Sequence, residues 1–280
     1  MLCSGNDAAV AIAEHIGGSV EGFADIMNQK ADSLGLKNTN FVTPHGLDNV
    51  NHYTTAYELS LITRYALNIP EISNIVRTKN TTVMINGYPK NIHNSNELLE
   101  ILNGVNGVKT GFTNNAGRCL VTSVSRNEFD IICIVLGADT KKMRTKDSIS
   151  LIEYCYKKYE LVNIENILKR DFEEWIKLNK ITVNKGKNDD VKLDVEELTY
   201  KILPIDKNKI KDIESEIQID KYVEAPILQG QKLGRINIKI DDEILCGTNV
   251  IISKEIVKKE PADYFFYILI NMKEILEKPI

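Results

Sequence analysis

The chain has 280 residues, of which 43% are apolar and 26% are charged, and its formal net charge is −4. This composition is typical of a soluble globular protein with one large domain or two ordinary ones, and it excludes a disordered chain. Lys and Arg do not exceed Asp and Glu, so there is no basic excess to neutralise phosphates and we expect no nucleic-acid partner.

The first seventy residues predict two helical segments separated by a loop. Apolar residues recur at three-to-four spacing over residues 7–31, which is typical of a helix. Residues 34–49 are dense in Gly, Asn and Pro and predict a loop. Helical spacing returns over residues 54–67, with one of the two leading threonines as N-cap. Pro70 is expected to close this helix, because proline is not tolerated in a helix interior.

From about residue 81 the pattern changes to short runs rich in β-branched residues. Turn sequences such as NGYP and RNEF separate these runs, which predicts strands. Helices, then strands, then a final helix indicate an α/β (α+β) layer with an antiparallel sheet over residues 1–160. The expected strands are 81–85, 119–125 and 129–137, and the expected closing helix is 146–159.

A second domain is expected after a linker. The composition turns charged between residues 160 and 180, as it would in a linker. Short strands bounded by polar turns follow at roughly sandwich-like intervals, which predicts a small all-β sandwich domain over residues 161–258. Its expected strands are 180–183, 191–195, 198–202, 234–240 and 248–253.

The last segment, residues 259–280, predicts an amphipathic helix. Two interpretations compete, a helix that docks on its own domain and a helix that lies in a membrane interface. No apolar run of the chain approaches the ~20 residues needed to cross a bilayer. The residues on the apolar stripe are Tyr264, Phe265, Ile268, Leu269, Met272, Ile275 and Leu276.

Cysteine and histidine spacing argues against a metal centre. The five cysteines and four histidines are scattered, without a C-x-x-C pair or an H-E-x-x-H motif. Zinc sites usually need such spacings. We therefore expect no metal and no other cofactor.

Two short motifs concentrate the polar side chains that an acyl-transfer site needs. Ser4-Gly5-Asn6 stands near the start, and Lys109-Thr110-Gly111 leads through Phe112 into a predicted strand. Either tripeptide alone is weak evidence, since Ser4 can simply lie near a helix N-cap and Lys109 can be a solvated charge at a strand end. Together and in this order they match two of the three elements of serine acyl-transferases that react with penicillin.

Each residue type in these motifs has a physical use. A lysine at a strand edge supplies positive charge, which attracts a ligand's terminal carboxylate and favours deprotonation of neighbouring hydroxyls. Thr110 can hydrogen-bond that carboxylate, and Gly111, which lacks a Cβ, lets a ligand backbone approach the strand closely. Ser4 can relay a proton, and Asn6 offers both a donor and an acceptor to an amide.

The chain resembles the D-alanyl-D-alanine carboxypeptidases, the low-molecular-mass penicillin-binding proteins that trim peptidoglycan stem peptides. SGNDAAVAIAEHI resembles the family's second motif with its helix, NTNFVTPHGLD the following loop, and NGVKTGFTNNAGRCLVTS the third motif with its strand. EAPILQGQKLGRINI is similar to the family's C-terminal β-domain, and the tail to its membrane anchor. The resemblance implies a penicillin-binding/β-lactamase-like transpeptidase fold, a β-domain and a membrane-associating helix.

The resemblance also implies roles and partners. Ser4 would be the proton-shuttling serine and Asn6 the contact to the substrate amide. Lys109 and Thr110 would bind the terminal carboxylate, and the backbone N–H of Phe112 would form half of the oxyanion hole. The implied partners are a peptidoglycan stem peptide ending in D-Ala-D-Ala, β-lactam antibiotics for the full-length enzyme, and the membrane surface, at the extracytoplasmic face of the bacterial cell membrane.

One element of the family pattern is missing. The first motif, S-x-x-K, holds the nucleophile and its activating lysine, yet none of the twelve serines has a lysine three positions on. We therefore expect an N-terminally truncated sequence whose transpeptidase-like domain is incomplete and which is inactive alone. Cys3 is not expected to replace the nucleophile, because no base is fixed near it.

Such a truncation would have a folding consequence. The apolar faces that a missing part covers would be exposed, and large exposed apolar patches promote association. We expect residues 1–160 alone to aggregate, whereas residues 165–258 should fold independently.

Two other functions stay open. The chain could be a non-catalytic envelope protein that binds peptidoglycan or partner proteins through the β-domain and the membrane through its tail. It could also be a β-lactamase relative, although the extra β-domain and the tail argue against this.

Overall fold

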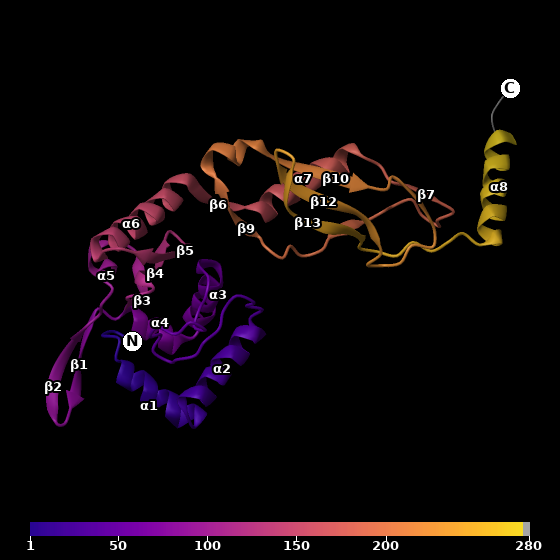
Figure 1. Ribbon diagram of the computed structural model, residues 1–280. Coiled ribbons are helices and arrows are strands. Elements are labelled where there is room, and N and C mark those ends of the chain that lie inside the picture. Colours follow the sequence, from indigo (N-terminus) through magenta and orange to yellow (C-terminus); the bar gives the residue numbers. More distant parts are fainter. Residues whose placement is uncertain (277–280) are drawn as a thin grey trace. The chain divides into compact units, whose positions relative to one another are not determined.

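The computed structural model describes residues 1–276, and the chain divides into two compact units, Met1–Lys157 and Lys158–Ile280 (Figure 1). In the first unit helices precede an antiparallel sheet, as predicted. The second unit is rich in strands. The long helix α6 (Lys141–Lys158) ends where the first unit ends.

The first helical stretch consists of two helices, where the sequence predicted one. α1 spans Asn6–Gly17 and α2 spans Val20–Ser33. Gly18 has a φ of 74°, a left-handed conformation that glycine adopts without strain and that ends α1. Ser19 then caps α2, because its hydroxyl accepts a hydrogen bond from the backbone N–H of Gly22.

The next two helices correct the expected role of a proline. α3 spans Ala56–Leu67, and the hydroxyl of Thr55 caps it by accepting a hydrogen bond from the backbone N–H of Glu58. The prediction that Pro70 closes this helix is wrong, because Pro70 is the first residue of α4 (Pro70–Arg77). Proline suits that position, where its missing N–H would have no intrahelical partner.

The loop before α3 is fixed by the buried carboxylate of Glu58. This carboxylate accepts hydrogen bonds from the backbone N–H groups of Lys37 and Asn38 and from the hydroxyl of Thr39. Burial alone would raise the pKa of the Glu58 carboxyl, but these hydrogen bonds outweigh burial and lower the pKa. The ionised carboxylate therefore ties the loop to α3 at neutral pH.

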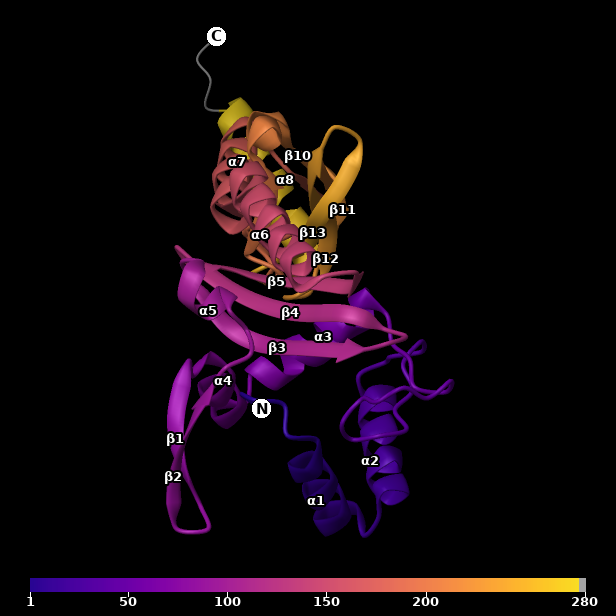
Figure 2. The ribbon, with the colours of Figure 1, turned by 60° about the vertical axis from the view of Figure 1, so that its left-hand side comes forward.

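The sheet of the first unit has three antiparallel strands, β3 (Val105–Thr113), β4 (Gly117–Arg126) and β5 (Phe129–Ala138), in the order β3-β4-β5 (Figure 2). This confirms the predicted strands 119–125 and 129–137 and the antiparallel arrangement, whereas β3 was not among the predicted strands. Helix α6, which begins earlier than predicted, covers one face of this sheet. The buried cluster between helix and sheet is Val124, Cys133, Val135 and Ile152.

A separate hairpin leads into the sheet. β1 (Asn80–Ile85) pairs with β2 (Tyr88–His93) as a two-stranded antiparallel sheet of its own. Asn86 and Gly87, which both have positive φ, form the turn, as the NG pair predicts. The short helix α5 (Leu98–Ile101) then connects the hairpin to β3.

The second unit is built on a four-stranded antiparallel sheet. Its order is β10 (Ile213–Ile219), β12 (Lys232–Ile240), β13 (Glu243–Ile252) and β8 (Leu193–Val195). Two smaller pairs accompany it: β6 (Tyr159–Asn163) with β9 (Ile202–Asp206), and β7 (Thr182–Asn184) with β11 (Tyr222–Glu224). A 3-10 turn, η1 (Lys207–Asp212), precedes β10. The sequence did not predict β10, and most of the expected strand 198–202 is irregular.

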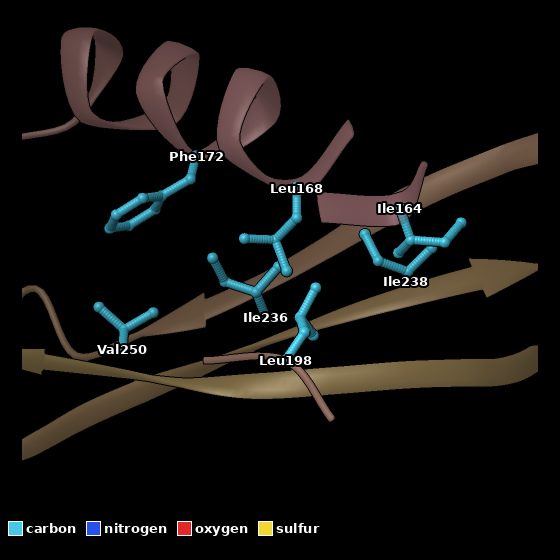
Figure 3. Packing of buried hydrophobic residues seen from close by; sticks show 7 residues of the cluster. All are labelled: Ile164, Leu168, Phe172, Leu198, Ile236, Ile238 and Val250. Atoms are coloured by element: carbon cyan, nitrogen blue, oxygen red, sulfur yellow. The ribbon is translucent and has the colours of Figure 1, made fainter. Parts of the chain in front are cut away.

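Residues 160–180 do not form the expected linker. Helix α7 (Ile164–Leu178) occupies most of this stretch. One face of the helix buries three of its own apolar side chains at four-residue spacing, Ile164, Leu168 and Phe172. They pack against Leu198, Ile236, Ile238 and Val250 (Figure 3). The domain is therefore a helix packed on a sheet, β-rich as expected but not all-β.

The last helix, α8, spans Pro261–Leu276. The side chains of Tyr264, Phe265, Ile268 and Leu269 are exposed. Met272, Ile275 and Leu276, which complete the predicted stripe, have side chains outside the described residues. Within residues 1–276 no helix is both long and apolar enough to span a membrane.

The core of the second unit generates a prediction about stability. Ile236 is fully buried in the cluster beneath α7, so Ile236→Ala is expected to lower the free energy of unfolding by about 2–5 kcal/mol. The matched control is Ile244→Ala on the neighbouring strand, where the side chain is 53% exposed and little should change. Urea unfolding can be followed by the fluorescence of Trp175, the only tryptophan in the chain, which lies on α7. Equal losses in the two variants would contradict the core assignment.

Candidate active site

The structure brings all six predicted site residues to the wall of one cavity of about 710 Å³ in the first unit. Helix α1 and the segment before it contribute Ser4 and Asn6, and strand β3 contributes the rest. The roles assigned to these residues stay predictions, but their convergence is a fact of the fold. The β3 residues on the wall are Lys109, Thr110, Gly111 and Phe112.

Strand β3 stands at the edge of its sheet. It pairs with β4 on one side only, with Lys109 opposite Val121 and Gly111 opposite Cys119. A Cβ added to Gly111 would meet only the Cβ of Cys119, at an ordinary 3.7 Å. The protein's own packing does not require glycine there, so the position leaves room for a ligand backbone on the free edge.

Lys109 carries the central positive charge of the cleft. Its Nζ donates a hydrogen bond of 2.6 Å to the carbonyl oxygen of Thr110, and within the described residues it forms no ion pair. Burial lowers the pKa of the Lys109 ammonium below its ordinary value of 10.5, with a smaller opposing effect of Cys3. A half-buried cation without a carboxylate partner is a natural contact for an anionic ligand.

Ser4 sits in an unusual backbone conformation. Its φ of 56° lies in the left-handed region, which costs a non-glycine residue on the order of 1–3 kcal/mol. Its side chain is exposed, and its hydroxyl has no hydrogen-bond partner within residues 1–276. The carbonyl of Leu2 accepts a hydrogen bond from the backbone N–H of Ser95 at 3.0 Å, which fixes this segment beside the cleft.

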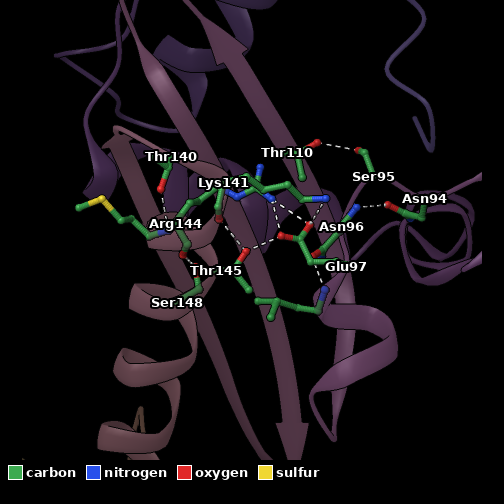
Figure 4. A network of polar contacts seen from close by, with 12 residues as sticks. Asn94, Ser95, Asn96, Glu97, Thr110, Thr140, Lys141, Arg144, Thr145 and Ser148 are labelled. Carbon is green, nitrogen blue, oxygen red and sulfur yellow. Dashed lines mark hydrogen bonds and ion pairs between the residues drawn. The ribbon is translucent and has the colours of Figure 1, made fainter.

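Ser95 links the two motifs, although the sequence did not single it out. Its hydroxyl lies 2.6 Å from the hydroxyl of Thr110 (Figure 4). The side-chain amide of the neighbouring Asn96 donates a hydrogen bond to the carbonyl of Gly107 on β3. These contacts fix the segment before α5 against the edge strand. Only the tertiary fold brings residues 94–97 to the cleft, so no local sequence signal could have identified them.

Arg144 is a second cation that the sequence analysis missed. It lies on α6 and is 4% exposed, yet it lines the cleft. Its Nη2 donates to both carboxylate oxygens of Glu97 at 2.8 Å, and its buried Nε has no hydrogen-bond partner within the described residues (Figure 4). Arg144 therefore brings a second cation to the cleft wall, but its charge is paired with the carboxylate of Glu97.

The loop resembling the family's NTNFVTPHGLD segment forms another part of the wall. His52 Nδ1 accepts hydrogen bonds from the backbone N–H groups of Val42 and Thr43, and its ring packs edge-on against Phe41. Burial, and secondarily the charge of His45, lowers the pKa of His52. The neutral ring therefore orders the loop by accepting these two bonds.

Taken together, the cleft can hold the carboxylate end of an extended peptide. Lys109 supplies a positive charge without an ionic partner among the described residues, the hydroxyls of Ser95 and Thr110 supply donors, and the β3 edge supplies main-chain groups. Within the described residues, Lys109 donates to the backbone carbonyl of Thr110 and forms no hydrogen bond with Ser4, the residue expected to relay a proton.

Comparison with known proteins agrees with the family resemblance of the sequence motifs. The family profile "D-alanyl-D-alanine carboxypeptidase" matches residues 1–140, and the profile "Penicillin-binding protein 5, C-terminal domain" matches residues 166–258. D-alanyl-D-alanine carboxypeptidase DacF of Bacillus subtilis is 35% identical over 259 residues, which cover 92% of this chain and 64% of that relative. The chain thus spans less than two-thirds of the relative's length.

Solved structures share the fold. Penicillin-binding protein 5 from Haemophilus influenzae superposes with a TM-score of 0.68 at 29% identity, covering 92% of this chain and 72% of that one. Penicillin-binding protein D2 from Listeria monocytogenes, in its cefotaxime-bound form, gives a TM-score of 0.50 at 32% identity over 55% of this chain and 62% of that one. Folded architecture and sequence motifs agree, and the chain belongs to the D-alanyl-D-alanine carboxypeptidase family.

Proposed function

We propose that this chain carries the substrate-binding half of a serine-type D-Ala-D-Ala carboxypeptidase, which removes the terminal D-alanine of peptidoglycan stem peptides through an acyl-enzyme. The observation that carries the proposal is the convergence of both motifs on one cleft around Lys109, a half-buried cation without a carboxylate partner among the described residues. A peptide with a free carboxylate end supplies the missing negative charge.

The proposed binding mode follows from the edge strand. The peptide backbone lies along β3 opposite Gly111, and its terminal carboxylate contacts Lys109 and Thr110. The backbone N–H of Phe112 then faces the carbonyl to be attacked and stabilises the developing oxyanion. Asn6 contacts the substrate amide, and Ser4 passes a proton to the leaving amine. A β-lactam, which also carries a carboxylate beside a reactive amide, would occupy the same cleft.

Turnover needs a group that these 280 residues do not contain. An acyl-enzyme requires a serine activated by a neighbouring base, and no serine of this sequence is followed by a lysine three positions later. We infer that the chain by itself binds the peptide without cleaving it. The same observation favours the second candidate, a non-catalytic envelope protein that binds peptidoglycan.

We also propose that α8 holds the protein at the extracytoplasmic membrane surface. Large apolar side chains are exposed on α8, with Phe265 at 61% and Phe266 at 62%. A helix with such side chains can lie in the headgroup region, where each buried apolar group adds to binding.

The cleft proposal predicts binding without acylation. The full chain should bind an acetylated L-Lys-D-Ala-D-Ala peptide reversibly in calorimetry and form no covalent adduct with labelled penicillin. Lys109→Met should weaken peptide binding by about tenfold or more, which corresponds to ~1.4 kcal/mol. The matched control is Lys142→Met, since Lys142 lies on the same unit but does not line this cleft. Stoichiometric acylation, or equal binding by Lys109→Met and the wild type, would contradict the proposal.

The tail proposal predicts binding to vesicles. The full chain should co-sediment with vesicles containing phosphatidylglycerol, and a Phe265→Ser, Ile268→Ser variant should bind about tenfold more weakly or worse, because two apolar groups no longer enter the membrane. Tyr222→Ser removes an aromatic side chain from β11 that is 82% exposed, more than those changed on α8, and serves as the control. If the α8 variant and the control bind alike, the helix is not the anchor.

A further inference from the structure

We propose that Glu97 is a positioning residue that sets how strongly the cleft favours a ligand with an anionic end, by neutralising Arg144. This inference rests on the proposed function of the cleft and assigns a role to a residue outside its motifs. Glu97 would act through Arg144 and would not touch the peptide itself.

The ion pair between Glu97 and Arg144 is built into the fold. Arg144 is almost fully buried, and its Nη2 contacts both oxygens of the carboxylate at 2.8 Å. The two residues come from α6 and from the turn that precedes α5, so the pair joins the helix to the cleft segment (Figure 4). A buried guanidinium needs such a partner, because an uncompensated charge is costly away from water.

Other groups hold the Glu97 carboxylate in place. The hydroxyl of Thr145 donates to it, and the ammonium of Lys141 lies 3.7 Å from its second oxygen. Burial would raise the pKa of Glu97, but the hydrogen bonds from Thr145 and Arg144 outweigh burial and lower it. Glu97 is therefore ionised at neutral pH, when a peptide carboxylate is ionised too.

The Glu97–Arg144 ion pair matters because the cleft is otherwise lined by positive charges. Four cationic side chains line the cleft: Lys109, Arg118, Lys141 and Arg144. Within residues 1–276, Glu97 is the only carboxylate that forms an ion pair with any of them. Arg118 lies over the ring of Phe112, 4.2 Å from its centroid, and Lys109 has no ionic partner in the described chain.

The consequence concerns selectivity between charged and neutral ligand ends. With Arg144 neutralised, Lys109 is left to attract the carboxylate, and the field in the cleft is weaker than four cations would produce. Removing the charge of Glu97 frees the charge of Arg144, which should tighten binding of a carboxylate and leave a neutral C-terminal amide unaffected. A purely structural role would change both ligands alike.

The test compares Glu97→Gln with wild type in the full chain. Calorimetry measures the affinity for acetylated L-Lys-D-Ala-D-Ala and for the same peptide as its C-terminal amide. Glu97→Gln is expected to tighten binding of the free acid on the order of fivefold, as one unit charge several ångströms away would do at a partly buried site. The gain should shrink at high salt, and the amide should bind unchanged.

Two further variants make the result specific. Glu100→Gln removes the same charge from α5, three residues after Glu97, at a side chain that forms no ion pair with Arg144 among the described residues, and its affinities should match wild type. Glu97→Asp draws the carboxylate back by one methylene and should increase the affinity for the free acid by a smaller factor. This variant replaces Glu97→Gln in the test if Glu97→Gln does not fold. Weaker or unchanged binding of the free acid by the Glu97 variants overturns the inference while the cleft function stands. Binding of neither peptide by any of the variants or by wild type means that the cleft function itself fails, and the inference with it.

Discussion

The half-buried ammonium of Lys109 at the margin of the sheet is the feature on which the functional account depends. Placing a lysine there costs solvation, and the fold provides no carboxylate to compensate it among the described residues. It offers only the carbonyl of Thr110 and an open edge strand. A fold that holds a charge in this way gains nothing in stability from it, so the arrangement is best understood through what it can bind.

The groups around Lys109 fix the shape of the cleft in which its charge lies. Ser95 ties Thr110 to the segment that also holds Leu2 and therefore Ser4. Glu58 and His52 fix two parts of the loop after α2 by accepting backbone hydrogen bonds, and the second of these forms part of the cleft wall. Glu97 holds Arg144. Each of these contacts links residues that are apart in sequence, and together they fix the walls of the cleft.

The sequence was informative where a short-range pattern was sufficient. Strands 119–125 and 129–137 were predicted from β-branched runs bounded by turns, and two motifs selected six residues that line one cavity. The sequence analysis did not predict α7, because its many charged residues suggested a linker. The helix is stabilised by apolar residues at four-residue spacing that pack on the sheet, and this packing cannot be read from the sequence. Pro70 was misinterpreted because a proline that ends one helix and a proline that begins the next look alike locally.

The part of the site that escaped prediction is made of tertiary contacts. Arg144, Glu97 and Ser95 belong to no motif, and each acquires its role only when α6 and the segment before α5 meet at β3. The second unit shows the same limit, since β10 becomes evident only through its pairing with β12. Local sequence patterns indicate which chemistry is available, and the fold determines which additional charges reach it.

The most direct test of the central claim is the pKa of Lys109 itself, measured by NMR titration of the chain with 13Cε-labelled lysine and assigned with the Lys109→Arg variant. Because burial disfavours the charged form, the free chain should show a pKa below 10.5. Addition of the D-Ala-D-Ala peptide should raise it, since a bound carboxylate favours the ammonium. A pKa at 10.5 that does not respond to the peptide would mean that Lys109 is an ordinary solvated charge, and the account of the cleft would be wrong.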